Sequence, residues 1–241
     1  MTTPEVGWLV SVSTVCVYRV RWGCPVYDLD ETIRARHSTR MFLPDPVPAQ
    51  LIDESLELAM RAPSNSNVQP WQLVLATGAA RNRLVAALLA KADSESPRVP
   101  RLPEAFAHLR RELGAQVYGA MGIARDDAQA RRRAVLRNWE FFRAPVAGVV
   151  CMHRDFGIVD GMGVGMFLQT LVLALTARGI GTCVQVSIAG YPDIVAEQLD
   201  IPAELSILCG LAIGHPDPGF AGNALRVGRE SVDKHVRFLD R

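Results

Sequence analysis

Apolar and polar positions alternate with a helical period over several stretches of the chain. Asp28 and Glu31 match an N-cap and its reciprocal partner, which predicts a helix that ends near Arg36. A second helix is predicted from Pro48 to Ala62, where apolar residues recur on one face. Similar patterns predict a helix after Gly78 and others over 104–118, 126–141, 166–177 and 192–199.

Continuous apolar runs predict the strands. They lie at 72–77 and 146–152, near residue 183, and at 206–214. Strands that alternate with helices, without internal repeats, predict a sheet covered by helices. From Asp93 to Pro103 the content of Ser, Pro and Arg rises, so we expect a loop or a lid there.

A glycine-rich run precedes the long helix at 166–177. Gly161, Gly163 and Gly165 are predicted to form a turn that leads into this helix. Their spacing lacks the third glycine of the dinucleotide-binding fingerprint, so close packing of the helix explains them better.

Residues 1–28 stand apart from this pattern. Apolar residues alternate there with Ser and Arg in a strand-like period, although Val15 and Val17 interrupt the polar face. The apolar stretch is short and follows no positively charged start, so neither a signal peptide nor a membrane span is indicated. We therefore expect a mobile N-terminal extension over 1–28 and one domain over 29–241.

Composition narrows the classes of function. Apolar residues make up 49% of the 241 residues and charged residues 21%, which is typical of a globular domain. A net charge of +1 gives no strong attraction to nucleic acid or membranes, and the one dense basic cluster, Arg131–Arg133, reads as a solvated helix face. Five Cys and five His are scattered without metal-ligand spacing, so we expect no metal and a reducing, cytoplasmic setting.

Two polar patches carry the candidate chemistry. The first, between a predicted helix and strand, offers hydrogen-bonding groups at almost every position, and it reads either as a solvated turn or as a ligand-binding loop. The second contains two arginines around a hydroxyl, which can chelate a phosphate, and two more arginines follow near the C-terminus. The residues concerned are Pro63, Ser64, Asn65, Ser66, Asn67 and Gln69 in the first patch, and Arg36, His37, Ser38, Arg40, Arg226 and Arg229 in the others.

Along the chain the motif at 36–40 comes first, the loop at 63–69 second and the basic tail last. With the three motifs in this order, the chain resembles the FMN-dependent nitroreductases from Leu29 to its end. The resemblance implies an α+β fold with a mixed central sheet covered by helices. It also implies an intertwined homodimer, in which the C-terminal segment 227–241 extends onto the partner. Within the family, the run from Tyr118 to Asp127 and the basic tail look most like the nitrobenzoate-type enzymes.

The resemblance implies roles for these residues around FMN. Arg36, Ser38 and Arg229 would serve the phosphate and ribityl end, and Arg40 the pyrimidine edge or the phosphate. The residues at 64–67 would come from the other subunit, and Gln69 would form a hydrogen bond at the edge of the ring. The stretch Gln185, Val186 and Ser187 would lie beside the ring, with the Val186 N–H nearest to N5. No residue is expected to act as a catalytic acid or base, since the flavin carries the redox chemistry.

The expected activity is two-electron, ping-pong reduction of nitroaromatics by NADPH or NADH. Three alternatives stay open: the same fold acting on quinones, enones or halogenated aromatics, a flavin-binding redox module without catalysis, and a dimer without a ligand. The sequence leaves open the physiological substrate and the choice between NADPH and NADH.

Overall fold

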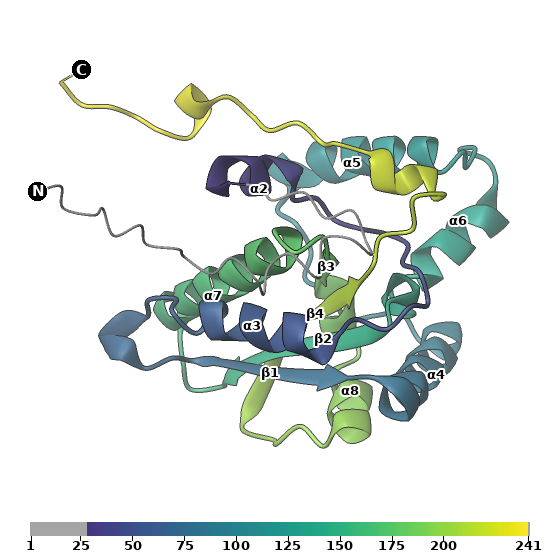
Figure 1. The fold of residues 1–241 in the computed structure, drawn as a ribbon. Coiled ribbons are helices and arrows are strands. Elements are labelled where there is room, and N and C mark those ends of the chain that lie inside the picture. Colours follow the sequence, from purple (N-terminus) through teal and green to yellow (C-terminus); the bar gives the residue numbers. More distant parts are fainter. Residues whose placement is uncertain (1–27, 241) are drawn as a thin grey trace, which may run out of the picture.

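The computed structural model describes residues 28–240, in which four strands form one sheet (Figure 1). The strands are β1 (Trp71–Ala76), β2 (Val146–His153), β3 (Gly181–Gln185) and β4 (Leu205–Gly214), in the order β1-β2-β4-β3. Every neighbouring pair of strands is antiparallel. All four strands lie within one or two residues of the predicted runs.

The α+β class is confirmed, but these strands do not form the mixed sheet that was expected. The parallel pairing in the described part of the chain is an isolated bridge between Ser38 and Thr182. A single bridge is too short to count as a strand, so the segment before Met41 borders the sheet without joining it.

Helices cover both faces of the sheet (Figure 1). On one face α3 (Ala49–Ala59) and α7 (Ile158–Thr176) enclose a core with one set of alternating β2 side chains, and Trp71 stacks on Phe167 with ring centroids 5.0 Å apart. On the other face α4 (Gly78–Ser94) and α8 (Pro192–Leu199) pack against the alternate set. β2 is buried on both faces, which explains why its sequence is continuously apolar.

Several helix boundaries follow local sequence signals. The helix α2 (Leu29–Ala35) begins with the expected capping box, in which the Glu31 N–H donates to the Asp28 carboxylate at 2.8 Å. The bounds of α8 match the prediction, and Pro192 occupies its first turn.

The glycine-rich run is not a turn. Gly161, Gly163 and Gly165 lie inside α7, which begins at Ile158, before the glycines, instead of at Met166. A Cβ on Gly163 would lie 3.2 Å from the Ser64 Cβ, so close packing does explain this position. Periodicity failed here because glycine carries no side chain that could mark a helical face.

The helix α7 is long and apolar enough to cross a membrane by length and composition, with a mean hydropathy of 1.8. One face packs in the core through residues such as Phe167 and Leu171. A helix buried in a protein core can meet the same criterion of length and hydropathy. The opposite face is apolar yet open, because Ile158 is 90% exposed and Met162 is 64% exposed.

The helices α5 (Ala107–Ala120) and α6 (Ala128–Leu136) lie at the top and upper right of the view, outside the helices that cover the sheet (Figure 1). Both are shorter than expected: residues 104–106 form the 3-10 turn η2 (Glu104–Phe106), and α6 ends five residues early. Beyond α6 the chain turns sharply into η3 (Phe141–Arg143), whose three residues all have positive φ. Such a backbone cannot continue an α-helix.

The C-terminal segment leaves the domain after η5 (Ala221–Ala224) and runs along its outside through η6 (Val232–Lys234) (Figure 1). Its apolar side chains include Val232, Phe238 and Leu239, which are all more than half exposed. The prediction for the extension over 1–28 lies almost wholly outside the described residues.

Candidate functional site

The segment 36–40 is fixed against the first residues of β3. The Thr39 N–H donates to the Thr182 carbonyl at 2.9 Å, and Thr39 is fully buried. A Cβ on Gly181 would lie only 2.6 Å from the Thr39 Oγ1, so this close approach requires glycine. The neighbours of Thr39, including Arg36, Ser38 and Arg40, keep part of their surface accessible.

A buried asparagine ties this segment to the C-terminal part of the chain. The Asn223 Oδ1 accepts from the Arg40 N–H at 2.7 Å, and its Nδ2 donates to the carbonyls of Met41 and Asp217 at 2.8 and 2.9 Å. The sequence did not indicate this role, because the contacts with Arg40 and Met41 join residues more than 180 positions apart and the only signal was an Asn at the start of the basic tail. Asn223 therefore brings two of the three predicted motifs together.

The two motifs form one cationic cluster. Burial lowers the pKa of Arg36, and the nearby Arg229 guanidinium lowers it further. Burial also lowers the pKa of His37, a shift that Arg226, Arg36 and Arg40 reinforce and that the Ala35 carbonyl at 2.9 Å from Nδ1 opposes. The cluster thus gathers positive charge from arginines while His37 favours its neutral form, an arrangement that fits a phosphate group.

The two C-terminal arginines are exposed and lightly held. Arg226 donates to the Asn223 carbonyl at 2.9 Å, and Arg229 donates to the Val227 carbonyl at 2.9 Å. These bonds are local to the tail, so both guanidinium groups keep donors for a ligand.

The loop at 64–69 is polar, exposed and strained. It contains η1 (Asn65–Asn67), and Ser66, Asn67 and Gln69 have φ values of 47°, 56° and 48°. Its own bonds hold it, because the Gln69 N–H donates to the Ser64 Oγ at 3.0 Å and the Gln69 side chain donates to the Asn67 carbonyl at 3.2 Å. Three left-handed residues without glycine are costly, and such strain often marks a binding segment.

Within one chain this loop lies far from the cationic cluster. Ser64 packs on Gly163 in the first turns of α7, whereas Thr39 packs on Gly181, beyond the end of that helix. The helix from Gly163 to Thr176 alone spans roughly 20 Å at 1.5 Å per residue. One copy of the chain therefore does not join all three predicted motifs.

The stretch 185–187 enters η4 (Val186–Gly190) with its side chains divided. Gln185 is buried, and its Nε2 donates to the Asn138 carbonyl at 2.7 Å. The Ser187 Oγ lies 3.4 Å from the Asn138 Oδ1, while the side chain of Val186 is half exposed. The Gln185 side chain thus supports η4 from inside, and Asn138, which sequence analysis did not identify, links η4 to the end of α6.

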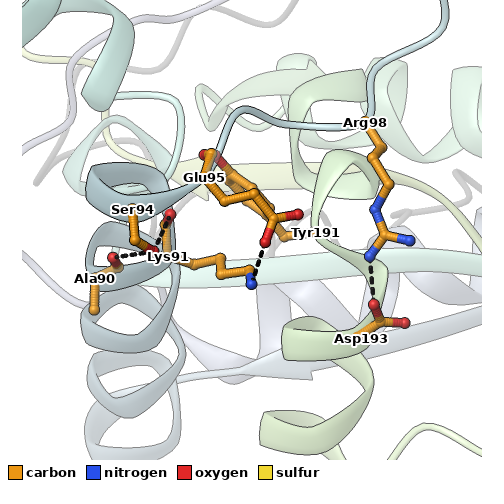
Figure 2. Close-up of polar contacts among 7 residues, drawn as sticks. All are labelled: Ala90, Lys91, Ser94, Glu95, Arg98, Tyr191 and Asp193. Carbon is orange, nitrogen blue, oxygen red and sulfur yellow. Dashed lines mark hydrogen bonds and ion pairs between the residues drawn. The ribbon is translucent and has the colours of Figure 1, made fainter.

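The loop after α4 is fastened to η4 and α8 (Figure 2). The Tyr191 Oη donates to the Glu95 carbonyl at 2.5 Å, the Arg98 N–H donates to the Gly190 carbonyl at 2.9 Å, and the Arg98 guanidinium pairs with Asp193. A Cβ on Gly190 would lie 2.7 Å from the Pro97 Cβ. The expected loop is present, and this part of it braces η4.

A cleft of about 890 Å³ opens between α5 and α6. Arg40, Asn138 and Phe142 contribute to its lining, so the cleft adjoins both the cationic cluster and η4. Tyr118 lines it as well. Neither Tyr118 nor Phe142 is among the site residues predicted from the sequence.

Comparison with known proteins places this site in a family. Residues 33–215 match the pattern of the Nitroreductase family. The chain is 34% identical to 4-nitrobenzoate reductase from Pseudomonas putida, over 88% of this chain and 96% of that protein, and 31% identical to nitrobenzene nitroreductase from Ectopseudomonas oleovorans, over 88% and 96%. The crystal structure of the FMN-dependent nitroreductase NfnB from Mycobacterium smegmatis, in complex with NADPH, superposes with a TM-score of 0.82 at 31% identity and covers 87% of this chain and 97% of NfnB.

The match covers most of the chain, and it includes the segment 36–40, the loop at 64–69 and η4. The chain belongs to the nitroreductase family.

Proposed function

We propose that this protein is an FMN-dependent NAD(P)H oxidoreductase that reduces nitroaromatic compounds in two-electron steps and acts as a homodimer. The observation that carries the proposal is the cationic cluster of segment 36–40 and the C-terminal arginines, which Asn223 holds beside β3. The relatives that act on nitrobenzoate and nitrobenzene support the reaction class.

The residues at hand fit FMN. Arg36, Arg229 and the Ser38 hydroxyl would hold the phosphate and the ribityl chain, and Arg40 would lie toward the pyrimidine edge. When bound, FMN supplies the hydride chemistry, so the protein needs no catalytic acid or base of its own. Arginines near the ring would stabilise negative charge that develops there, and His37, whose pKa burial lowers, would stay neutral.

The remaining ligands would come from a second copy of the chain. Ser64, Asn65, Ser66, Asn67 and Gln69 would reach the ring and ribityl groups from the partner subunit, since one chain separates them from segment 36–40 along α7. The open apolar face of α7 supports this arrangement, because Ile158, Met162 and Gly165 leave room for another helix. The exposed tail, with Phe238 and Leu239, suits an arm that packs on a partner.

The described cysteines suit a cytoplasmic location. Cys151, Cys183 and Cys209 are free and buried, and burial raises the pKa of each thiol to about 11. Thiols of this kind behave as small apolar side chains and need no oxidising compartment.

A visible absorption spectrum of the purified protein tests the function. We expect flavin bands that bleach when NADPH is added without oxygen and return when a nitrobenzoate follows. A panel with quinones and halogenated aromatics then ranks the alternative oxidants. If added FMN neither binds nor is reduced, the proposal is wrong.

A further inference from the structure

Three consecutive arginines on α6 have three different surroundings. The Arg131 guanidinium lies over the Tyr118 ring, 4.3 Å from its centroid, and lines the cleft between α5 and α6. Arg132 points elsewhere and pairs with Asp93 at 2.7 Å. Arg133 is exposed and does not line the cleft. The sequence alone suggested that this basic cluster is a solvated helix face. The structure shows instead that only Arg133 of the three fits that description.

Four other arginines line the cleft together with Arg131. Arg110 and Arg111 from α5, Arg125 from the connection and Arg40 from the cationic cluster line the same space, against one acidic residue, Glu112. None of these five arginines forms an ion pair within residues 28–240. Unpaired like charges around one cavity repel one another, so their gathering is favourable once an anion binds among them.

The rest of the lining suits a planar aromatic or heteroaromatic body. Met121, Ile123 and Val117 provide apolar surface, and Tyr118 both offers a ring and holds Arg131 in place. A stacked guanidinium has lost part of its freedom in advance, so it binds an oxyanion at a lower entropic cost. At the other end the cleft reaches Asn138, which contacts η4.

We infer that the cleft between α5 and α6 is an oxyanion subsite, in which Arg131, supported by Arg110, Arg111 and Arg125, binds the anionic group of a planar ligand that reaches the flavin. Two ligands of the proposed reaction carry such a group. One is a carboxylated aromatic oxidant, and the other is NADPH, which a phosphate group distinguishes from NADH. The inference rests on the proposed function for its ligand, while the subsite itself follows from the arginines and the cavity.

Matched variants of the full-length dimer test the subsite. Arg131→Gln removes the stacked charge, and Arg133→Gln removes the same charge two residues away, outside the cleft. Calorimetry measures the binding of benzoate against benzamide and of NADP⁺ against NAD⁺ to the oxidised protein. Steady-state kinetics then gives two ratios of KM values. One compares NADH with NADPH, and the other compares a nitrobenzamide with the nitrobenzoate.

We expect Arg131→Gln to weaken the binding of one anionic ligand about tenfold while its neutral counterpart changes little, because a charge-assisted hydrogen bond at a half-buried site is lost. Loss of benzoate selectivity identifies the oxidant's carboxylate, and loss of NADP⁺ selectivity identifies the reductant's phosphate. Arg133→Gln should leave both ratios unchanged. Tyr118→Leu, which keeps every charge but removes the stacking surface, should weaken the same ligand less.

Equal effects of Arg131→Gln and Arg133→Gln, or no change in either selectivity, would overturn the subsite. If Arg131→Gln unfolds the protein, Arg125→Gln, outside any helix, takes its place with the same expected selectivity. A protein that binds these anions through Arg131 but never reduces FMN would refute the proposed function and leave the subsite standing.

Discussion

The cationic cluster and the loop at 64–69 are built in opposite ways. The cluster is bound into its own chain, since Asn223 joins residues far apart in sequence and Thr39 is sealed against Gly181. The loop depends on itself, with exposed amides, local hydrogen bonds and three left-handed residues. The cluster is completed by contacts within one chain, whereas the loop leaves most of its polar side chains exposed in the part of the chain that the structure describes.

This difference implies that the cluster and the loop have different roles. A site completed by the fold of one chain can hold the phosphate end of a cofactor, while a strained loop at the surface becomes useful once another surface faces it. Changes at the surface that is proposed to face a partner should therefore abolish flavin binding without unfolding the chain. Changes in the cluster should reduce the stability of the chain.

The largest effect is expected from a charge on the open face of α7. Met162→Arg would bury an unpaired cation in the proposed dimer interface, which costs several kcal/mol. We expect a folded monomer without bound flavin, measured by light scattering after size exclusion and by the absorption spectrum. Leu102→Arg, at a residue 51% exposed in the loop after α4, is the control and should stay dimeric. A flavin-loaded dimer of Met162→Arg would contradict the interface.

One asparagine variant in each region should distinguish the cationic cluster from the loop. Asn223→Ala removes the three hydrogen bonds of a buried side chain and should lower the free energy of unfolding by about 2 to 4 kcal/mol. Asn65→Ala, in the exposed loop, should change it by less than about 0.5 kcal/mol. Urea unfolding of the flavin-free proteins measures both, and FMN affinity should fall in both. Equal stability of the two variants would mean that Asn223 does not fasten the cluster.

Relief of strain in the loop should act with opposite signs on stability and binding. Ser66 has φ 47°, so Ser66→Gly should raise the free energy of unfolding by about 0.5 to 1 kcal/mol, after the entropy that glycine adds to the unfolded chain. FMN should bind more weakly, because a hydroxyl and a fixed loop shape are lost. A gain in both properties would show that the strain has no part in binding.

The smallest effect concerns pH. Burial lowers the pKa of His37 below its ordinary value of 6.5, so the unfolded chain binds the proton more readily than the folded one. Stability should therefore rise as the pH increases toward 6.5 and level off above it. His37→Gln should flatten this part of the profile of unfolding free energy against pH, whereas an unchanged slope would mean that His37 contributes none of it.

Local signals predicted much of the fold, and long-range contacts explain the misses. The Asp28 capping box and the bounds of α8 depend on residues a few positions apart, so the sequence contains them directly. Asn223 works across more than 180 residues, and Asn138 across 47, to Gln185. The spacing of residues along the sequence does not predict contacts between residues so far apart.

The candidate site divides in the same manner. The three polar motifs were visible as runs of residue types, and the family match confirms the family that they indicated. The directions of Arg131, Arg132 and Arg133 were not visible, since they depend on Tyr118 and Asp93. Nor could the sequence show that the loop and the cluster lie at opposite ends of α7.

Subunit complementation tests the central claim that the flavin site joins segment 36–40 of one chain to the loop at 64–69 of the other. One chain carries Arg36→Ala and Arg40→Ala, its differently tagged partner carries Asn65→Ala and Asn67→Ala, and the heterodimer is purified through both tags. Each variant homodimer should bind FMN poorly. The heterodimer contains one site with both motifs intact, so it should regain roughly half of the FMN content and NADPH-dependent activity of the unaltered dimer. A heterodimer as empty as its parents would contradict the claim, because each site would then take both motifs from a single chain.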